Sequence, residues 1–201
     1  PEDTKEVVDR AEKMLLDVTN RDVHSNEQSL EEIMGDLYED LEEAAANGDK
    51  PLGVSTGFPS IDRCLLGLRP GQMVVIGARP GVGKTSFALN LATNAAFAGA
   101  SVALFSLEMS KVEIAQRLLA ANARIGLQEI RSGKIRNEQW PQIIEATEEL
   151  SKLDITIDDT AGTTVTEIRA KARRILRGKP LGIVIVDYLQ LISPASGSRS
   201  D

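Results

Sequence analysis

The sequence predicts an α/β domain with a parallel sheet that helices cover on both faces, preceded by an acidic helical segment. From residue 51 onward, short apolar runs alternate with helical patterns, which is typical of parallel sheets. Residues 1–50 contain 16 acidic and 5 basic residues, a net charge of −11. Residues 51–201 contain 14 acidic and 18 basic residues, a net charge of +4. We therefore expect a helical linker region over 1–50 and an α/β domain over 51–201.

The acidic segment is predicted to form two helices. In the first helix, the residues at helical spacing are Val7, Ala11, Met14, Leu15 and Val18. A capping box of Ser25 and Gln28 opens the second helix, and Gly48 ends it. Its apolar stripe comprises Leu30, Ile33, Leu37 and Leu41. Two such helices cannot bury an adequate core alone, so the stripes either pack on their own domain or dock on a neighbouring subunit.

In the α/β part, each predicted element follows from a local pattern. Apolar runs predict strands at 72–78, 101–108, 154–159 and 182–187. Helical patterns fall between them at 86–98, 110–123, 137–152 and 164–177. Gly99 ends the first of these helices, and capping boxes at Ser110 with Glu113 and Thr164 with Glu167 open two others. We expect the sheet to be incomplete within these 201 residues.

Composition excludes several classes of protein. A single cysteine, Cys64, excludes an intramolecular disulfide framework, and no apolar stretch approaches the ~20 residues of a membrane span. The acidic N-terminus is unlike a signal or transit peptide, so we expect a soluble cytoplasmic protein without a membrane partner. Aromatic residues make up only 3% of the chain, and we interpret Trp140 and Phe105 as core residues rather than base-stacking platforms.

A glycine-rich loop with one lysine joins the first predicted strand to the first helix. Gly81 and Gly83 allow backbone N–H groups to turn toward an anion, and the helix N-terminus adds positive potential. The pattern G-x-x-x-x-G-K-[ST] describes such loops, but Ala78 stands where it has glycine, and Gly77 comes one place early. The predicted nucleotide-binding residues are Ala78, Arg79, Pro80, Gly81, Val82, Gly83, Lys84, Thr85 and Ser86.

Four side chains are candidates for the chemistry of a bound nucleotide. Lys84 would contact the β- and γ-phosphates, and the Thr85 hydroxyl would ligate Mg²⁺. Ligands of parallel sheets bind at the carboxyl ends of the strands, where Asp187 could hold the metal and Glu108 could deprotonate an attacking water. The alternatives are that Asp187 caps the following turn and that Glu108 only opens a helix.

Five segments together resemble one family. They are GARPGVGKTSFALNLA, FSLEMS, IRSGKIRNEQW, ITIDDTAGTTVTEIRAKARRI and VIVDYLQL, all within residues 51–192. This combination is similar to the RecA-like motor domain of bacterial replicative DNA helicases of the DnaB type, and residues 1–50 resemble the linker region of that family. Alanine at the position of Ala78 is common in such helicases.

The resemblance implies an ATP-dependent helicase that assembles as a homo-hexamer, hydrolyses nucleotide at subunit interfaces and translocates on single-stranded DNA at replication forks. It implies ATP and Mg²⁺ as cofactors, and primase and a helicase loader as partners. By motif match, Lys84 and Thr85 bind phosphate and metal, Asp187 binds the metal, Glu108 is the catalytic base and Gln190 lies near the site as a sensor. A trans-acting arginine is expected outside these 201 residues.

Two alternatives remain open from the sequence. One is another RecA-like DNA-dependent ATPase, such as a recombinase or repair paralogue, although their characteristic zinc and recombination motifs are absent and DYLQL is present. The other is a nucleotide-binding interaction module whose linker helices bind a partner.

Overall fold

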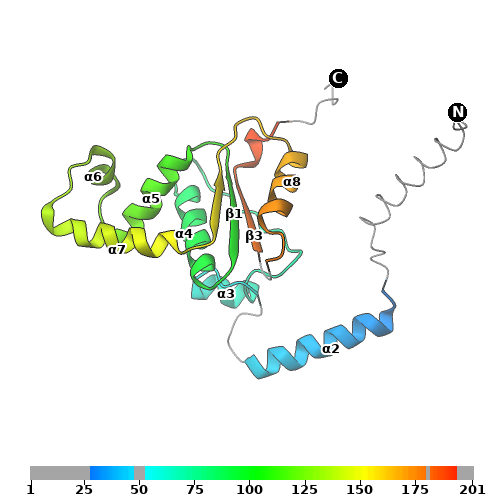
Figure 1. The fold of residues 1–201 in the computed structure, drawn as a ribbon. Coiled ribbons are helices and arrows are strands. Elements are labelled where there is room, and N and C mark those ends of the chain that lie inside the picture. Colours follow the sequence, from blue (N-terminus) through cyan, green and yellow to red (C-terminus); the bar gives the residue numbers. More distant parts are fainter. Residues whose placement is uncertain (1–27, 48–52, 180–181, 194–201) are drawn as a thin grey trace, which may run out of the picture. The chain divides into compact units, whose positions relative to one another are not determined.

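The computed structural model describes residues 28–47, 53–179 and 182–193 (Figure 1). The chain divides into two units, Pro1–Gly48 and Asp49–Asp201. Within the described part of the chain, every helix is too short or too polar to cross a membrane.

A capping box opens helix α2 (Leu30–Asn47) of the first unit. The Ser29 N–H donates to Oε2 of Glu32 at 2.8 Å, and the Glu32 N–H donates to Oγ of Ser29 at 3.2 Å. The predicted box of Ser25 and Gln28 therefore does not open α2, which begins at Leu30, and Ser25 itself lies outside the described residues. The Gln28 side-chain amide instead donates to Asp36 at 3.4 Å.

The apolar stripe of α2 is solvent-exposed. The exposed fractions of its predicted members are 71% for Leu30, 44% for Ile33, 45% for Leu37 and 59% for Leu41. The stripe of the first predicted helix, Val7 to Val18, lies outside the described residues, as does Gly48.

The second unit combines a parallel sheet with a cluster of helices (Figure 1). Its α-helices are α3 (Pro59–Leu65), α4 (Lys84–Phe97), α5 (Lys111–Ala123), α6 (Leu127–Ser132), α7 (Trp140–Ser151) and α8 (Val165–Ile175). Its strands are β1 (Ser101–Ser106), β2 (Ile155–Asp158) and β3 (Gly182–Asp187), with short 3₁₀ helices at Asn137–Gln139 and Leu189–Leu191.

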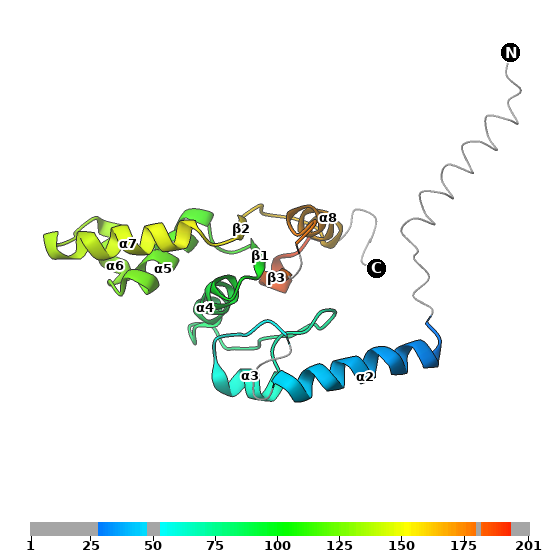
Figure 2. The same cartoon turned by 60° about the horizontal axis from the view of Figure 1, so that its bottom comes forward.

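The sheet has the strand order β2-β1-β3, and both pairings are parallel. All six residues of β1 are buried, and their side chains alternate between the two faces. Val102 and Leu104 pack in clusters with α4 and α5, whereas Ala103 and Phe105 pack with α8. Figure 2 shows α4 and α8 on opposite sides of the sheet. The predicted parallel sheet with helices on both faces is confirmed.

The predicted strand over 72–78 is not formed. These residues have no regular secondary structure, and Met73 is 87% exposed and Val75 67% exposed. An apolar run becomes a strand only when a neighbouring strand pairs with it, and within the described residues β3 pairs only with β1. The composition of the run is that of a strand, but no described strand pairs with it, and a local sequence pattern cannot show whether a pairing strand is available.

Other local predictions were more successful. Ser110 with Glu113 and Thr164 with Glu167 form the predicted capping boxes of α5 and α8. Phe105 is fully buried as predicted, but Trp140 is 47% exposed, so its interpretation as a core residue is wrong. Trp140 begins α7, and the core side of that helix is supplied by smaller residues that follow it, Ile143 and Ala146.

Candidate functional site

The glycine loop leads directly into the N-terminus of α4. Gly83 is the N-cap residue in the left-handed conformation with φ of 108°, and Gly81 has φ of 80°. A Cβ at either position would meet open space, so the positive φ is the reason for glycine in the chain as it stands. Among the described residues, no side chain caps α4. The backbone N–H groups of its first turn are therefore available to an anion.

Asp187, at the end of β3, meets the first two residues of α4. The Thr85 hydroxyl donates to Oδ2 of Asp187 at 2.6 Å, although the two residues are 102 positions apart. Lys84 Nζ lies 3.3 Å from Oδ1 of the same carboxylate. The Asp187 residue is only 5% exposed, so its charge is held in place by these two partners. Three of the predicted site residues are thus brought together.

Tyr188 is a fourth side chain in this cluster, and the sequence analysis missed it. Lys84 Nζ lies 3.9 Å from the centroid of the Tyr188 ring, within the range of a cation–π interaction. The ring and the Asp187 carboxylate therefore hold the ammonium group between them. An aromatic residue directly after the strand-end aspartate was the signal that could have revealed it.

Glu108 and Gln190 lie on loops beside this cluster. Ser106 pairs in register with Asp187, and the Leu107 N–H donates to the Asp187 carbonyl at 2.8 Å. Glu108 is the next residue, and its side chain is exposed. Gln190 is exposed in the 3₁₀ turn after β3. Within the described residues, no hydrogen bond or ion pair joins either side chain to Lys84, Thr85 or Asp187.

The side-chain oxygens of Asp187 and Thr85 fit a magnesium ion. Mg²⁺ is usually bound through one or two carboxylates together with substrate phosphates and waters, rather than by a cage of protein ligands. Asp187 and the Thr85 hydroxyl supply two adjacent hard oxygen ligands. The described residues contain no cluster of three or more His, Cys, Asp or Glu side chains suited to a metal.

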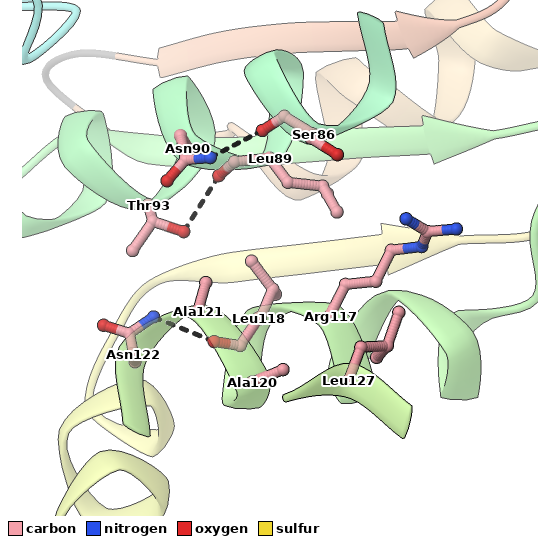
Figure 3. A pocket seen from close by; sticks show the side chains of 10 residues that line it. All are labelled: Ser86, Leu89, Asn90, Thr93, Arg117, Leu118, Ala120, Ala121, Asn122 and Leu127. Carbon is pink, nitrogen blue, oxygen red and sulfur yellow. Dashed lines mark hydrogen bonds between the residues drawn. The ribbon is translucent and has the colours of Figure 1, made fainter. Parts of the chain in front are cut away.

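A cavity of about 170 Å³ lies beside α4, between α4, α5 and α6 (Figure 3). Three of its polar side chains donate hydrogen bonds within their own helices, whereas the buried Nε of Arg117, which also lines it, has no hydrogen-bond partner among the described residues. Asn90 donates to the Ser86 carbonyl at 2.7 Å, Thr93 to Leu89 at 2.9 Å, and Asn122 to Leu118 at 3.0 Å. Lys84, Thr85 and Asp187 do not line this cavity. We therefore place the candidate site at the loop and not in the cavity.

The parallel sheet, the glycine loop that opens a helix and the strand-end aspartate beside it define the P-loop class of α/β domains. The DnaB-like helicase C terminal domain family matches residues 53–201. The chain belongs to this family.

Similar proteins agree with this family. The chain is 36% identical over 201 residues to the replicative DNA helicase DnaC of Bacillus subtilis, a match that covers 100% of this chain and 44% of the relative. It is 36% identical to the replicative DNA helicase DnaB of Geobacillus stearothermophilus, over 97% of this chain and 43% of the relative. The chain thus spans less than half the length of these relatives.

Two solved structures are similar to the fold. A solved ATPase domain superposes with a TM-score of 0.81 at 36% identity, covering 87% of this chain and 62% of that one. A DnaB-like replicative helicase, described with its interactions with primase, superposes with a TM-score of 0.76 at 32% identity, covering 98% of this chain and 51% of that one. These likenesses favour the helicase interpretation over a recombinase or repair paralogue.

Proposed function

We propose that this chain carries part of the motor of an ATP-dependent replicative DNA helicase. The observation that supports this most strongly is the pairing of Lys84 and Thr85 with Asp187 at the N-terminus of α4, in a chain of the DnaB-like family. Residues 51–201 form the N-terminal part of a RecA-like ATPase domain, and residues 1–50 form its helical linker region.

ATP binds at residues 78–86, where the free N–H groups at the start of α4 face the phosphates. Lys84 turns from the Asp187 carboxylate toward the β- and γ-phosphates and neutralises their charge. Thr85 and Asp187 would hold Mg²⁺ with the two side-chain oxygens that share a hydrogen bond in this structure. When bound, this ion would neutralise charge that develops on the phosphates during transfer.

Glu108 acts as the general base that accepts a proton from the attacking water. Its carboxylate is exposed on the loop next to Asp187, so it can reach a water without first breaking a bond within the protein. Gln190 lies in the 3₁₀ turn that follows β3, at the same edge of the sheet, and senses the state of the nucleotide.

The working form is a homo-hexamer on single-stranded DNA at replication forks, in the cytoplasm, with primase and a helicase loader as partners. The exposed apolar stripe of α2 supports assembly, because a helix with such a face needs a surface that covers it. The helicase names of the relatives support the DNA substrate. The similar helicase structure that is described with its primase interactions supports primase as a partner.

Hydrolysis of ATP and unwinding of a forked duplex by the full-length protein test this proposal. We expect hydrolysis that single-stranded DNA stimulates, together with ATP-dependent unwinding. A protein that binds ATP but neither hydrolyses it nor unwinds DNA would favour a nucleotide-binding interaction module instead.

A further inference from the structure

The loop that carries Glu108 is short and anchored at its start. Residues 107–110 join the end of β1 to the beginning of α5. The Leu107 N–H donates to the Asp187 carbonyl at 2.8 Å. The Ser106 hydroxyl, in a residue that is 3% exposed, donates to the Met109 carbonyl at 2.8 Å and accepts from the Met109 N–H at 3.2 Å. The first bond ties the start of the loop to β3, and the other two hold Met109 against the end of β1.

Asp159, the residue after the end of β2, anchors the other end of the loop. Its Oδ2 accepts a hydrogen bond from the backbone N–H of Lys111 at 3.0 Å, across 48 positions of sequence. Lys111 is the first residue of α5, so this N–H is one of those that a helix cannot satisfy itself. The capping box uses only the N–H groups of Ser110 and Glu113. Asp159 therefore supplies the acceptor that the box leaves out.

We propose that Asp159 is a positioning residue for the catalytic step, which holds the loop so that Glu108 keeps its place beside Asp187. This inference rests on the proposed role of Glu108 as the general base. Asp159 lies at the same edge of the sheet as the site but contacts neither the glycine loop nor β3. A positioning role gives a reason for a carboxylate at this place.

The backbone bond, rather than the ion pair, carries this effect. Lys111 Nζ also lies 3.5 Å from Oδ1 of Asp159, but the Lys111 side chain is 67% exposed. Exposed pairs of this kind are worth little because water screens them. The hydrogen bond from the Lys111 N–H is also the largest cause that lowers the pKa of Asp159, ahead of the charge of Lys111.

Two substitutions at Lys111 separate the two contacts. Lys111→Met removes only the ion pair. Lys111→Pro also removes the backbone donor, and proline is tolerated at the first position of a helix. The preceding residue, Ser110, already has the extended conformation that proline requires, with φ of −68° and ψ of 151°. Lys111→Pro therefore tests the bond without altering Asp159.

Asp158 offers a matched control one residue away. Its carboxylate lies 2.7 Å from Lys171 Nζ on α8 and accepts from the Thr160 N–H at 3.0 Å, so it faces the opposite side of the sheet from α5. Asp158→Asn removes a charge from the same strand end without touching the Glu108 loop.

The experiment compares single-turnover ATP hydrolysis and ATP affinity in the full-length protein. Asp159→Ala and Lys111→Pro should each lower the hydrolysis rate about 10- to 100-fold, the usual effect of losing a group that orients a catalytic ligand, with Kd for ATP changed by less than about 3-fold. The hydrolysis rate should stay within about 3-fold of the parent in the two control variants, Lys111→Met and Asp158→Asn. It should also stay within about 3-fold in Asp159→Asn, because the asparagine side chain keeps an oxygen that can accept from the Lys111 N–H. If Asp159→Ala does not fold, the hydrolysis rates of Lys111→Pro and Lys111→Met are compared instead, and equal rates would overturn the inference.

A double substitution separates this inference from the role of Glu108. In a Glu108→Gln background, Lys111→Pro should cause little further loss, because the group that it positions is already gone. If Glu108→Gln slows hydrolysis but Lys111→Pro does not, the inference is wrong and the proposed function stands. If Lys111→Pro slows both backgrounds equally, Asp159 acts elsewhere, which also overturns it. If Glu108→Gln leaves hydrolysis unchanged, Glu108 is not the general base, and the inference about Asp159, which rests on that role, is wrong as well.

Discussion

The ion pair that ties the end of β2 to α8 should make a measurable, pH-dependent contribution to stability. The Asp158 carboxylate is 2.7 Å from Lys171 Nζ, and the two side chains are only 18% and 25% exposed. Asp158→Asn keeps the size of the side chain and removes its charge. The variant therefore reports the electrostatic part of this contact.

The size of the effect follows from the pKa of Asp158. Partial burial opposes ionisation, but hydrogen bonds from Lys171 and Thr160 outweigh it and lower the pKa from 3.8 to about 2. At 1.36 kcal/mol per pKa unit, this corresponds to about 2 kcal/mol of folding free energy. Because the pKa is lower in the folded state, this stabilisation is complete at neutral pH. It is lost as the pH falls from about 4 through about 2.

Urea unfolding of the parent and Asp158→Asn at several pH values measures this contribution. We expect a difference of about 2 kcal/mol at pH 7 that narrows to roughly half near pH 3. Asp154→Asn is the control, because the Asp154–Lys179 pair is 47% and 42% exposed and should be worth well under ~1 kcal/mol. A difference for Asp158→Asn that is absent at pH 7, or that does not change with pH, would refute the reasoning.

Three further predictions concern the proposed motor. Glu108→Gln should bind ATP normally but hydrolyse it about 10²- to 10⁴-fold more slowly, since it removes a general base; equal loss of binding, seen by calorimetry, would make Glu108 a ligand or structural residue. Leu37→Asp, in the exposed stripe of α2, should reduce the hexamer fraction in sedimentation without unfolding the α/β domain, and an unchanged fraction would contradict a role in assembly. Because these 201 residues span less than half the length of the relatives, we expect them alone to bind Mg-ATP weakly, hydrolyse it barely and unwind no duplex, and robust DNA-stimulated turnover by them would contradict this prediction.

Patterns contained within a few residues predicted the structure well. The capping boxes of α5 and α8 were predictable because the cap and its partner are three residues apart, as in Ser110 with Glu113. The meeting of Thr85 with Asp187 was also predictable, although the two are far apart in sequence. In a parallel sheet, the strand ends and the loop before a helix gather at one edge, so topology alone brings them together.

Features that depend on distant partners were not predictable in the same way. The run 72–78 has the composition of a strand, but whether it forms one depends on a pairing strand from another part of the chain, which the run itself does not reveal. Trp140 is exposed because neighbouring apolar residues fill the core beneath α7. The bond from the Lys111 N–H to Asp159 joins a backbone group at the start of α5 to a side chain just after β2, 48 positions away. Every residue except proline carries a backbone N–H, so no sequence pattern shows which one a distant carboxylate will accept from.

The most direct test of the proposed motor is ATP hydrolysis by full-length Lys84→Ala. In the structure, Lys84 lies between the Asp187 carboxylate and the Tyr188 ring at the start of α4, and its side chain is 29% exposed. The substitution should abolish DNA-stimulated hydrolysis, because it removes the charge that neutralises the β- and γ-phosphates, while the circular dichroism spectrum stays unchanged. Hydrolysis at the parental rate would contradict the assignment of this loop as the nucleotide site.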